Sequence, residues 1–536
     1  MTPSIPPPDY YLNYFRQMVL VVSERYADIL NPEDQAFIHR LNQCSDQAAR
    51  LLVRLYLRKG PNFLVNKLNY AEVTDLDGAV IELVTAELAE LNPVVFGYEM
   101  VELLPIAVSR EIFSDDPKCR KADLVDAWLD DDELRTCSEW GVEEPVITPC
   151  HYETVRRLQL MYFGNARQDL TEFILEDLGL FKYEQYRLDK SNRLFNRAED
   201  IEQLIALQDL SADFYLLNDS KDWSNLNILA EAAEALVLPE NLAHKWHRLL
   251  NRIAYRLEQL GELERALTLF QTNDQPPSRE RKARILFKLE RYEEAWIILQ
   301  AIASNPLSTD EPQFYRRFAN KVRNKLGLKK IVQDKPLIKE FQVTWPKGDG
   351  CVELLATEHF NGSVWLENQL PMAVFGLIYW PVIFADVSGV WHHPFQSGPT
   401  DLTEAEFSLR RKAILDDIAR HSLEQWREAI QNHWQQKNGV RNPFVNWSAL
   451  SLDLVLTCFD ALSHHQWRAI FNHILSDIRH HRSGFPDLFQ VNDGQYRFIE
   501  IKGPGDKLQD NQIAWLTVFQ QNNINAEVCY VRYAED

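Results

Sequence analysis

The sequence lacks the features that mark secreted and disordered proteins. Its seven cysteines are scattered, with no CxxC pair and no Cys/His spacing that suits zinc, so we expect free thiols in a reducing cytosol. The N-terminus contains prolines where a signal peptide has a basic flank and an apolar run. Glycine and proline are not enriched, which argues against long low-complexity segments. The composition therefore predicts a globular intracellular chain.

Long apolar runs are also scarce. Only Leu370 to Val387 approaches a membrane span, and it is short, contains Pro381 and follows Glu367 closely. We expect a buried helix there and no membrane association.

The chain is poor in positive charge, with a formal net charge of -21. An acidic protein repels DNA at long range, so any DNA-binding site must be a local basic patch. The charges are segregated along the chain. Residues 130–133 are all acidic, whereas the stretch 316–330 has no acid and carries Arg316, Arg317, Lys321, Arg323, Lys325, Lys329 and Lys330.

The length predicts several domains. At 536 residues the chain exceeds a single hydrophobic core, and we expect three or four domains of mainly α-helical structure. The patterns suggest an N-terminal helical domain (1–95), a small element (96–150), a repeat region with a linker (151–350) and a C-terminal α/β domain (351–536).

The N-terminal part has helical periodicity from Tyr10 to about Cys150, with a stripe formed by Phe15, Met18, Val19 and Val22. Within it, Leu103 to Leu129 forms two helical halves around an Asp-Asp-Pro turn. The outline is compatible with a small SAP-like DNA-binding element, and an ordinary helical hairpin fits the pattern equally well.

Two segments of the middle region repeat each other. Leu257 to Phe270 and Ile285 to Leu299 both contain a leucine-rich helix, a short turn and then an alanine, Ala266 in one and Ala295 in the other. The period is slightly shorter than that of a tetratricopeptide repeat. We therefore predict an irregular TPR-like stack of helix pairs.

The C-terminal part begins after a linker or strand-bearing connection, Val332 to Gly350. Helical patterns follow over Glu353 to Ile383, Thr403 to Gln436 and Leu452 to His481. From Asp487 onward the periodicity changes from helical to alternating.

Two short apolar runs after Asp487 are separated by Asn492-Asp493-Gly494, which indicates a β-hairpin with a type I′ turn. Asp487 opens the first strand. Side chains alternate along the second strand, which places Glu500 and Lys502 on the same face.

A carboxylate and a lysine two residues apart, beside an aspartate on the neighbouring strand, suit hydrolysis with a hard cation such as Mg²⁺ or Mn²⁺. Asp487 and Glu500 would hold the metal, which activates water, and the ammonium of Lys502 would orient the nucleophile and stabilise charge at phosphorus. The alternative is an exposed strand with a Glu-Lys pair and a turn-capping aspartate. The hairpin, the spacing and the following Gly-Pro-Gly favour the metal site.

The residues Pro486-Asp487, Glu500-Ile501-Lys502-Gly503-Pro504 and Asp506 to Leu516 resemble the VRR-NUC branch of the PD-(D/E)xK nucleases. Upstream segments are similar to the Fanconi anaemia-associated nuclease family, so the resemblance covers nearly the whole chain. These segments are Tyr10 to Leu12, Leu52 to Lys59, the SAP-like stretch, Phe375 to Trp380 and Asp477 to His480.

The resemblance implies further site residues. Glu367, shortly before the apolar helix, matches a metal-binding glutamate of the family. The resemblance also implies that the backbone carbonyl of Ile501 binds metal and that Gln512 borders the site. We expect Glu367 to come from a helix more than a hundred residues before the hairpin; the alternative is that it only caps a buried helix. Eukaryotic members carry a ubiquitin-binding zinc finger whose Cys/His set this sequence lacks, so no ubiquitin-binding module is expected and a bacterial member is the simplest interpretation.

Basic residues that could contact DNA occur in two places. Near the hairpin they are Arg479, His480, His481, Arg482 and Lys507. In the helical repeats, the candidates for binding the end of a DNA strand are Lys245, His247, Arg248, Arg252, Arg279, Arg281, Lys282 and Arg284. The alternative is that these residues form a solvated helix face.

The sequence thus predicts a structure-selective, metal-dependent DNA nuclease, with 5′-flap endonuclease and 5′ to 3′ exonuclease activity in the repair of cross-linked DNA as the resemblance implies. The alternatives are a junction-resolving endonuclease of the same superfamily and a catalytically silent DNA-binding scaffold. Its location would be the cytoplasm, beside the nucleoid, in a bacterium and the nucleus in a eukaryote.

Overall fold

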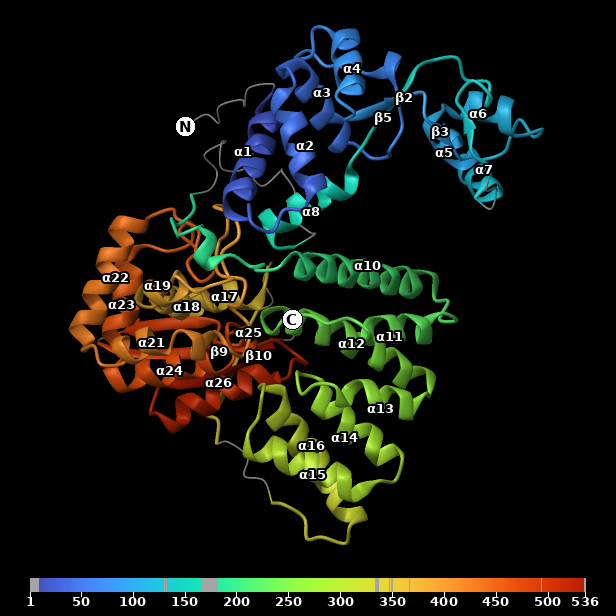
Figure 1. Ribbon diagram of the computed structural model, residues 1–536. Helices are drawn as coiled ribbons and strands as arrows, with labels where there is room; N and C mark the ends of the chain where they lie inside the picture. Colours follow the sequence, from blue (N-terminus) through green and yellow to red (C-terminus); the bar gives the residue numbers. More distant parts are fainter. Residues whose placement is uncertain are drawn as a thin grey trace. The chain divides into compact units, whose positions relative to one another are not determined.

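The structure is a computed structural model. It describes residues 9–129, 131, 133–165, 182–332, 337–346, 348, 350–365, 367–492 and 494–534. The chain divides into two compact units (Figure 1), the first made of Met1–Leu180 with Leu188–Ile201 and the second of Phe181–Arg187 with Glu202–Asp536. No helix among the described residues is long and apolar enough to cross a bilayer.

The first unit is mainly helical, as expected. Its elements are α1 (Tyr10–Arg25), α2 (Pro32–Gln43), α3 (Asp46–Tyr56), β1 (Phe63–Leu64), η1 (Val65–Lys67), α4 (Leu76–Thr85), β2 (Ala89–Leu91), β3 (Val94–Val95), α5 (Gly97–Leu103), α6 (Ile106–Phe113), α7 (Lys121–Trp128), β4 (Arg135–Thr136), β5 (Val146–Pro149), α8 (Tyr152–Phe163), η2 (Lys190–Asn192) and the start of α10 (Ala198–Ser220). The stripe from Phe15 to Val22 is buried, which confirms the periodicity.

The expectation of an entirely helical segment from Tyr10 to Cys150 is wrong. A three-stranded sheet of order β1-β5-β2 and a β3-β4 pair lie within it. These strands have two to four residues, too few for an alternating pattern to be recognised. Within the SAP-like stretch, α6 and α7 form the two expected helices, packed with α5 around buried Met100, Phe113 and Leu124.

The helices that follow α10 in the second unit form a continuous stack (Figure 1). They are α11 (Leu226–Glu234), α12 (Glu240–Leu260), α13 (Leu263–Gln271), α14 (Ser278–Lys288), α15 (Tyr292–Ser304) and α16 (Asp310–Lys325). From α11 to α16 each helix packs on the next. The two repeat alanines, Ala266 and Ala295, are both fully buried, because each lies where its helix meets its neighbour. The predicted stack of helix pairs is confirmed.

The remainder of the second unit is an α/β domain. Its elements are β6 (Glu340–Trp345), α17 (Val352–His359), β7 (Ser363–Trp365), α18 (Gln369–Ile378), α19 (Trp380–Ile383), α20 (Phe407–Arg410), α21 (Lys412–Ile418), α22 (Leu423–Lys437), α23 (Leu452–Ala461), α24 (His464–Ser476), α25 (Ile478–His481), β8 (Leu488–Asn492), β9 (Gln495–Lys502), α26 (Asp510–Gln521) and β10 (Ala526–Tyr533).

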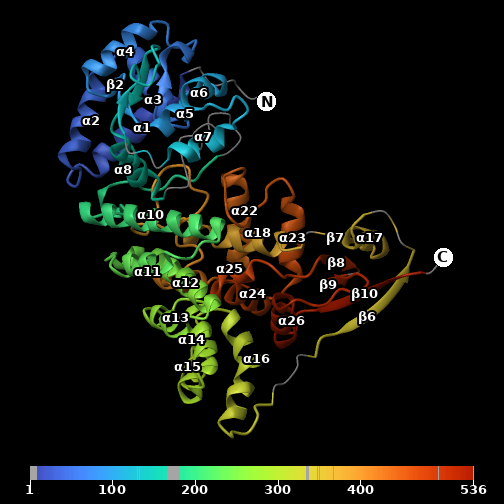
Figure 2. The same ribbon diagram turned by 90° about the vertical axis from the view of Figure 1, so that its right-hand side faces the viewer.

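Five strands form one sheet of order β6-β10-β9-β8-β7, visible in Figure 2. The pairs β6-β10 and β10-β9 are parallel, whereas β9-β8 and β8-β7 are antiparallel. On one face, Ile499 and Ile501 pack with Ala356 of α17. On the other face, Phe498 packs with α18, α23, α24 and α26. The central strand β9 is therefore covered by helices on both sides.

Two expectations for this domain need correction. The helical pattern from Glu353 to Ile383 is interrupted by β7, because Asn361-Gly362 makes a turn in which Gly362 has φ +75° and a Cβ would lie 3.0 Å from the carbonyl of Val491. The sheet also includes β6, which precedes the boundary expected at residue 351 and lies in the connection predicted as strand-bearing. The apolar run after Leu370 is buried as expected, and it is divided into α18 and α19 near Pro381.

Candidate active site

The β8-β9 hairpin brings Asp487 and Glu500 together. Leu488 pairs with Ile499, so the same register places Asp487, the residue just before β8, opposite Glu500. The Oδ2 atom of Asp487 accepts a hydrogen bond from the backbone N–H of Ile501 at 2.7 Å. Asp493 of the connecting turn lies outside the described residues.

Glu500 is held by two donors from different elements. Lys502 Nζ lies 2.8 Å from Glu500 Oε1, and Gln512 Nε2, from α26, donates to the same oxygen at 2.5 Å. Glu500 is 1% exposed and Lys502 is 7% exposed. The second oxygen of Glu500, Oε2, is buried and has no hydrogen-bond partner among the described residues. The site therefore contains a fixed carboxylate with one oxygen unsatisfied.

The electrostatics of the pair favour an added cation. Burial raises the pKa of Glu500 to about 8, and the negative charge of Asp487 adds to the rise while Lys502 opposes it. Burial likewise raises the pKa of Asp487 to about 6, against the hydrogen bond from Ile501. A divalent cation would relieve this repulsion and occupy the unsatisfied oxygen of Glu500. The two carboxylates thus fit a divalent metal.

Glu367 does not lie on a helix, contrary to expectation. It precedes α18, in a turn with φ +44°, and its backbone N–H donates to the carbonyl oxygen of Asp487 at 3.1 Å. Its side chain is exposed, and its charge contributes to the raised pKa of Asp487. In the described part of the chain no three acidic, histidine or cysteine side chains are grouped closely enough to hold a metal. Glu367 therefore lies beside the pair without completing a three-carboxylate cluster in this conformation.

Ile501 presents only its backbone to the site. Its side chain is buried in the cluster on the opposite face of the sheet, and its N–H is engaged by Asp487. A role for its carbonyl as a ligand remains a prediction.

A fourth acidic residue, Glu353, was missed by the sequence reasoning. It lies in the first turn of α17, and its negative charge raises the pKa of both Asp487 and Glu500. A single glutamate in a short helix carries no signal in one sequence. Its proximity becomes evident only when α17 packs against β9.

The basic residues near the hairpin differ in accessibility. Arg482 and Lys507 are exposed, and the side chain of Arg479 is half-exposed. The expectation that His481 faces DNA is wrong: it is 3% exposed and stacks on His473 with ring centroids 3.5 Å apart. Burial lowers the pKa of His481, which disfavours the charged form needed to contact phosphate. His480 is held by Asp477, with Nδ1 2.8 Å from the carboxylate.

Four basic residues of the repeats form ion pairs with nearby carboxylates. Arg281 contacts Glu258 at 2.6 Å, where the glutamate side chain is 2% exposed. The others pair as Arg279 with Glu311, Lys282 with Asp274 and Arg284 with Glu280. Arg281, Arg279 and Lys282 join α14 to α12, to α16 and to the turn before α14, whereas the Arg284–Glu280 pair lies within α14. These ion pairs therefore have a structural role whatever else the residues contact.

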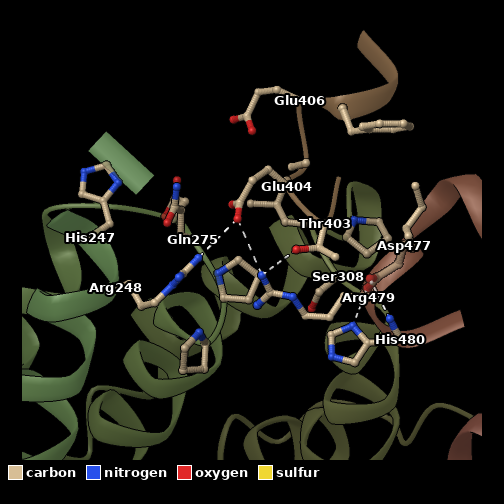
Figure 3. A pocket seen from close by; sticks show the side chains of 18 of the residues that line it. His247, Arg248, Gln275, Ser308, Thr403, Glu404, Glu406, Asp477, Arg479 and His480 are labelled. Carbon is tan, nitrogen blue, oxygen red and sulfur yellow. Dashed lines mark hydrogen bonds and ion pairs between the residues drawn. The ribbon is translucent and has the colours of Figure 1, made fainter. Parts of the chain in front are cut away.

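Arg248 instead lines a pocket of about 740 Å³ between α12 and the segment around Glu404 (Figure 3). Glu404 Oε1 lies 3.2 Å from Arg248 Nη2 and 3.7 Å from Arg479 Nη2, so one carboxylate bridges two arginines. His247 Nδ1 and Ser308 Oγ, also in the lining, are buried and have no hydrogen-bond partner within the part of the chain that the structure describes. Lys245 is half-buried on α12 and is not part of this lining.

Comparison with known proteins identifies two matching domain families. The VRR-NUC domain matches residues 422–533, and the family described as "FAN1, HTH domain" matches residues 9–90. The Fanconi-associated nuclease 1 homolog of Pseudomonas aeruginosa is 33% identical over 100% of this chain and 98% of that protein. Human Fanconi-associated nuclease 1 is 23% identical over 97% of this chain, which spans 62% of the human protein.

Two solved structures are similar along the whole chain. The crystal structure of paFAN1 bound to DNA with a 2-nucleotide 5′ flap and a gap has a TM-score of 0.88 and 32% identity, and the match covers 100% of both chains. The structure of paFAN1 with a 1-nucleotide 5′ flap and a gap has a TM-score of 0.85 and 32% identity, and covers 99% of this chain and 100% of that one.

Proposed function

The chain belongs to the Fanconi-associated nuclease 1 family and is a structure-selective DNA nuclease, and from this premise we propose that it cuts DNA near a 5′ end or 5′ flap. The supporting observation is the pairing of Asp487 with Glu500 beside Lys502 on a buried central strand. Its role is in DNA repair, including the removal of interstrand cross-links, and its location is beside the chromosomal DNA.

The family uses a divalent metal ion, and here Mg²⁺ or Mn²⁺ would be held by Asp487, Glu500 and Glu367 with the carbonyl of Ile501. When bound, the metal lowers the pKa of water and neutralises charge on the scissile phosphate. Glu367 would have to turn its exposed side chain toward Asp487, to which its backbone is already bonded.

The surrounding residues orient the reacting groups. Gln512 and Lys502 both contact Glu500 Oε1, which fixes the carboxylate and leaves Oε2 for the metal. The ammonium of Lys502 is positioned to orient the attacking water and to stabilise charge that develops at phosphorus. The hydrogen bond from Ile501 fixes Asp487 in the same way. Positioning of this kind lets the chain catalyse in-line attack without a covalent intermediate.

Cleavage assays on end-labelled DNA test this proposal. We expect cuts close to the junction of a 5′ flap with Mg²⁺ or Mn²⁺, little cleavage of a 3′ flap, and no cleavage in EDTA. Paired symmetric cuts in a four-way junction, with an uncut flap, would favour the junction-resolving alternative. Absence of cleavage together with absence of metal binding by calorimetry would favour a silent DNA-binding scaffold.

The predicted DNA-binding role of Arg248 and Arg479 leads to a test at Glu404, which forms ion pairs with both arginines. The change Glu404→Gln removes this internal counter-ion, so we expect flap DNA to bind about threefold to tenfold more tightly at low salt. Fluorescence anisotropy in EDTA measures the affinity. Glu406→Gln is the matched control, because Glu406 lines the same pocket and has no ion pair with either arginine among the described residues. Equal affinities for the two variants would contradict the assignment.

A further inference from the structure

An open hollow of about 690 Å³ lies between α15 and α16, away from the catalytic hairpin. Its lining includes Trp296 and Ile297 of α15 and Tyr315 and Arg323 of α16. We call it the α15–α16 hollow. The core of α15 is formed by Ala295, Leu299 and Ile302 on another side of the helix, so the hollow is not needed to bury that core.

The side chains of the hollow form an aromatic and cationic platform. The guanidinium of Arg323 lies over the ring of Trp296, 5.0 Å from its centroid, and the ring of Tyr315 is 6.5 Å from that of Trp296 at an angle of 31°. Ile297 beside them is 64% exposed. Flat aromatic and guanidinium surfaces of this kind stack on unpaired nucleobases, whatever the base, because every base has a π face.

The charge around the hollow suits a polyanion. Lysines of the acid-free stretch 316–330 lie on and after α16, all exposed: Lys321, Lys325, Lys329 and Lys330. None of the four pairs with a carboxylate within the described residues. The Nε of Arg323 donates to the carbonyl of Lys329 at 2.6 Å, which ties the last lysines to the platform. In a chain of net charge -21, Lys329 and Lys330 form a local positive surface beside the platform. Lys321 and Lys325 each lie about 200° around α16 from Arg323 and therefore extend from the opposite side of the helix.

We propose that the α15–α16 hollow binds a single-stranded segment of DNA, with a base stacked on Trp296 and Arg323 and phosphates on Lys329 and Lys330 beside the platform. Duplex DNA does not fit this chemistry, because its bases are already stacked and their faces are inaccessible. The inference rests on DNA being the substrate and not on which bond is cut.

The single-stranded DNA in the hollow is distinct from the DNA strand at the catalytic residues. Arg317 contacts Asp510 at the start of α26, the helix that carries Gln512. Helical geometry places Tyr315 roughly 200° around α16 from Arg317, so the hollow is on the opposite side of the helix. A displaced single strand held there would be kept away from the active site.

Binding of a labelled oligothymidylate in EDTA, followed by fluorescence anisotropy, tests this inference without any cleavage. We expect Trp296→Ala to weaken binding by roughly fivefold to a hundredfold, because one stacked base is lost. Trp223→Ala is the matched control: Trp223 carries Arg256 at 4.1 Å in the same way but lies outside the α15–α16 hollow. Circular dichroism melting verifies that both variants fold, and Arg323→Gln provides a second variant that leaves the helix core unchanged.

Replacing Lys329 and Lys330 by glutamine gives an independent readout. The slope of log affinity against log salt should fall by up to about 1.4, since each phosphate contact on a single strand contributes about 0.7. Unchanged oligothymidylate binding in the Trp296→Ala and Arg323→Gln variants would overturn the inference. So would equal losses with Trp296→Ala and Trp223→Ala. If flaps are not cut but oligothymidylate binding depends on Trp296, the inference stands and the proposed cleavage fails.

Discussion

Replacing Asp487 by asparagine should abolish flap cleavage, with a loss of at least about a thousandfold, or about 4 kcal/mol of transition-state stabilisation. Asparagine retains an oxygen that can accept the hydrogen bond from Ile501, so the hairpin should remain intact. What it removes is the negative charge that attracts the metal. Single-turnover cleavage at saturating enzyme measures the chemical step directly.

Thermal unfolding separates this effect from misfolding. Asp487 and Glu500 repel each other in a buried setting, so the metal-free Asp487→Asn variant should melt at the same temperature as the parent protein or higher. The parent should gain stability on addition of Mn²⁺, and the variant should gain little. A variant that binds Mn²⁺ normally and still cuts flap DNA would remove Asp487 from the site.

Metal affinity should depend steeply on pH. A cation needs both carboxylates ionised, and in the metal-free protein the pKa of Asp487 is about 6 and that of Glu500 about 8. Between pH 8 and pH 6 both groups take up protons, so the apparent affinity should fall by about a hundredfold. Calorimetry in buffers of different ionisation enthalpy would also detect the protons released on binding.

The raised pKa values of Asp487 and Glu500 also determine whether folding stability rises or falls with pH. Between pH 4 and pH 8, roughly, the folded metal-free protein binds more protons at these two groups than the unfolded chain does, so their contribution lowers stability as pH rises through that window. Bound metal should therefore stabilise the folded protein most near pH 8, the upper end of this pH window. Glu353→Gln removes a charge that raises the pKa of both Asp487 and Glu500. The midpoint of the rise in metal affinity with pH should therefore move to lower pH in this variant. An affinity that is constant from pH 6 to pH 8 would contradict this account.

The hairpin was predictable because its signals are local. Alternation over Gln495 to Lys502 specifies which side chains share a face, and a glycine-containing turn fixes the register that sets Asp487 opposite Glu500. Neither inference needs knowledge of the rest of the chain. The helix pairs of the repeat region were predictable for the same reason.

The features that were missed depend on packing between distant segments. Glu353 joins the site only through the contact of α17 with β9, and β7 exists because β8 pairs with it across more than a hundred intervening residues. Whether a basic side chain can contact DNA also depends on its neighbours: Arg248 and Arg281 both form ion pairs, but the partner of Arg281, Glu258, is almost fully buried, whereas Glu404 beside Arg248 is partly exposed. Charge pairing of this kind cannot be inferred from one sequence.

The position of β10 has a consequence for biosynthesis. It follows the other four strands of this sheet in the sequence, and it lies between β6 and β9 in the middle of the sheet. During synthesis each helix of the stack contacts mainly its sequence neighbours and can pack early, whereas β9 gains its second partner only after residues Ala526–Tyr533 have been synthesised. A nascent or truncated chain could therefore contact nucleic acid through its helices while remaining unable to cut it.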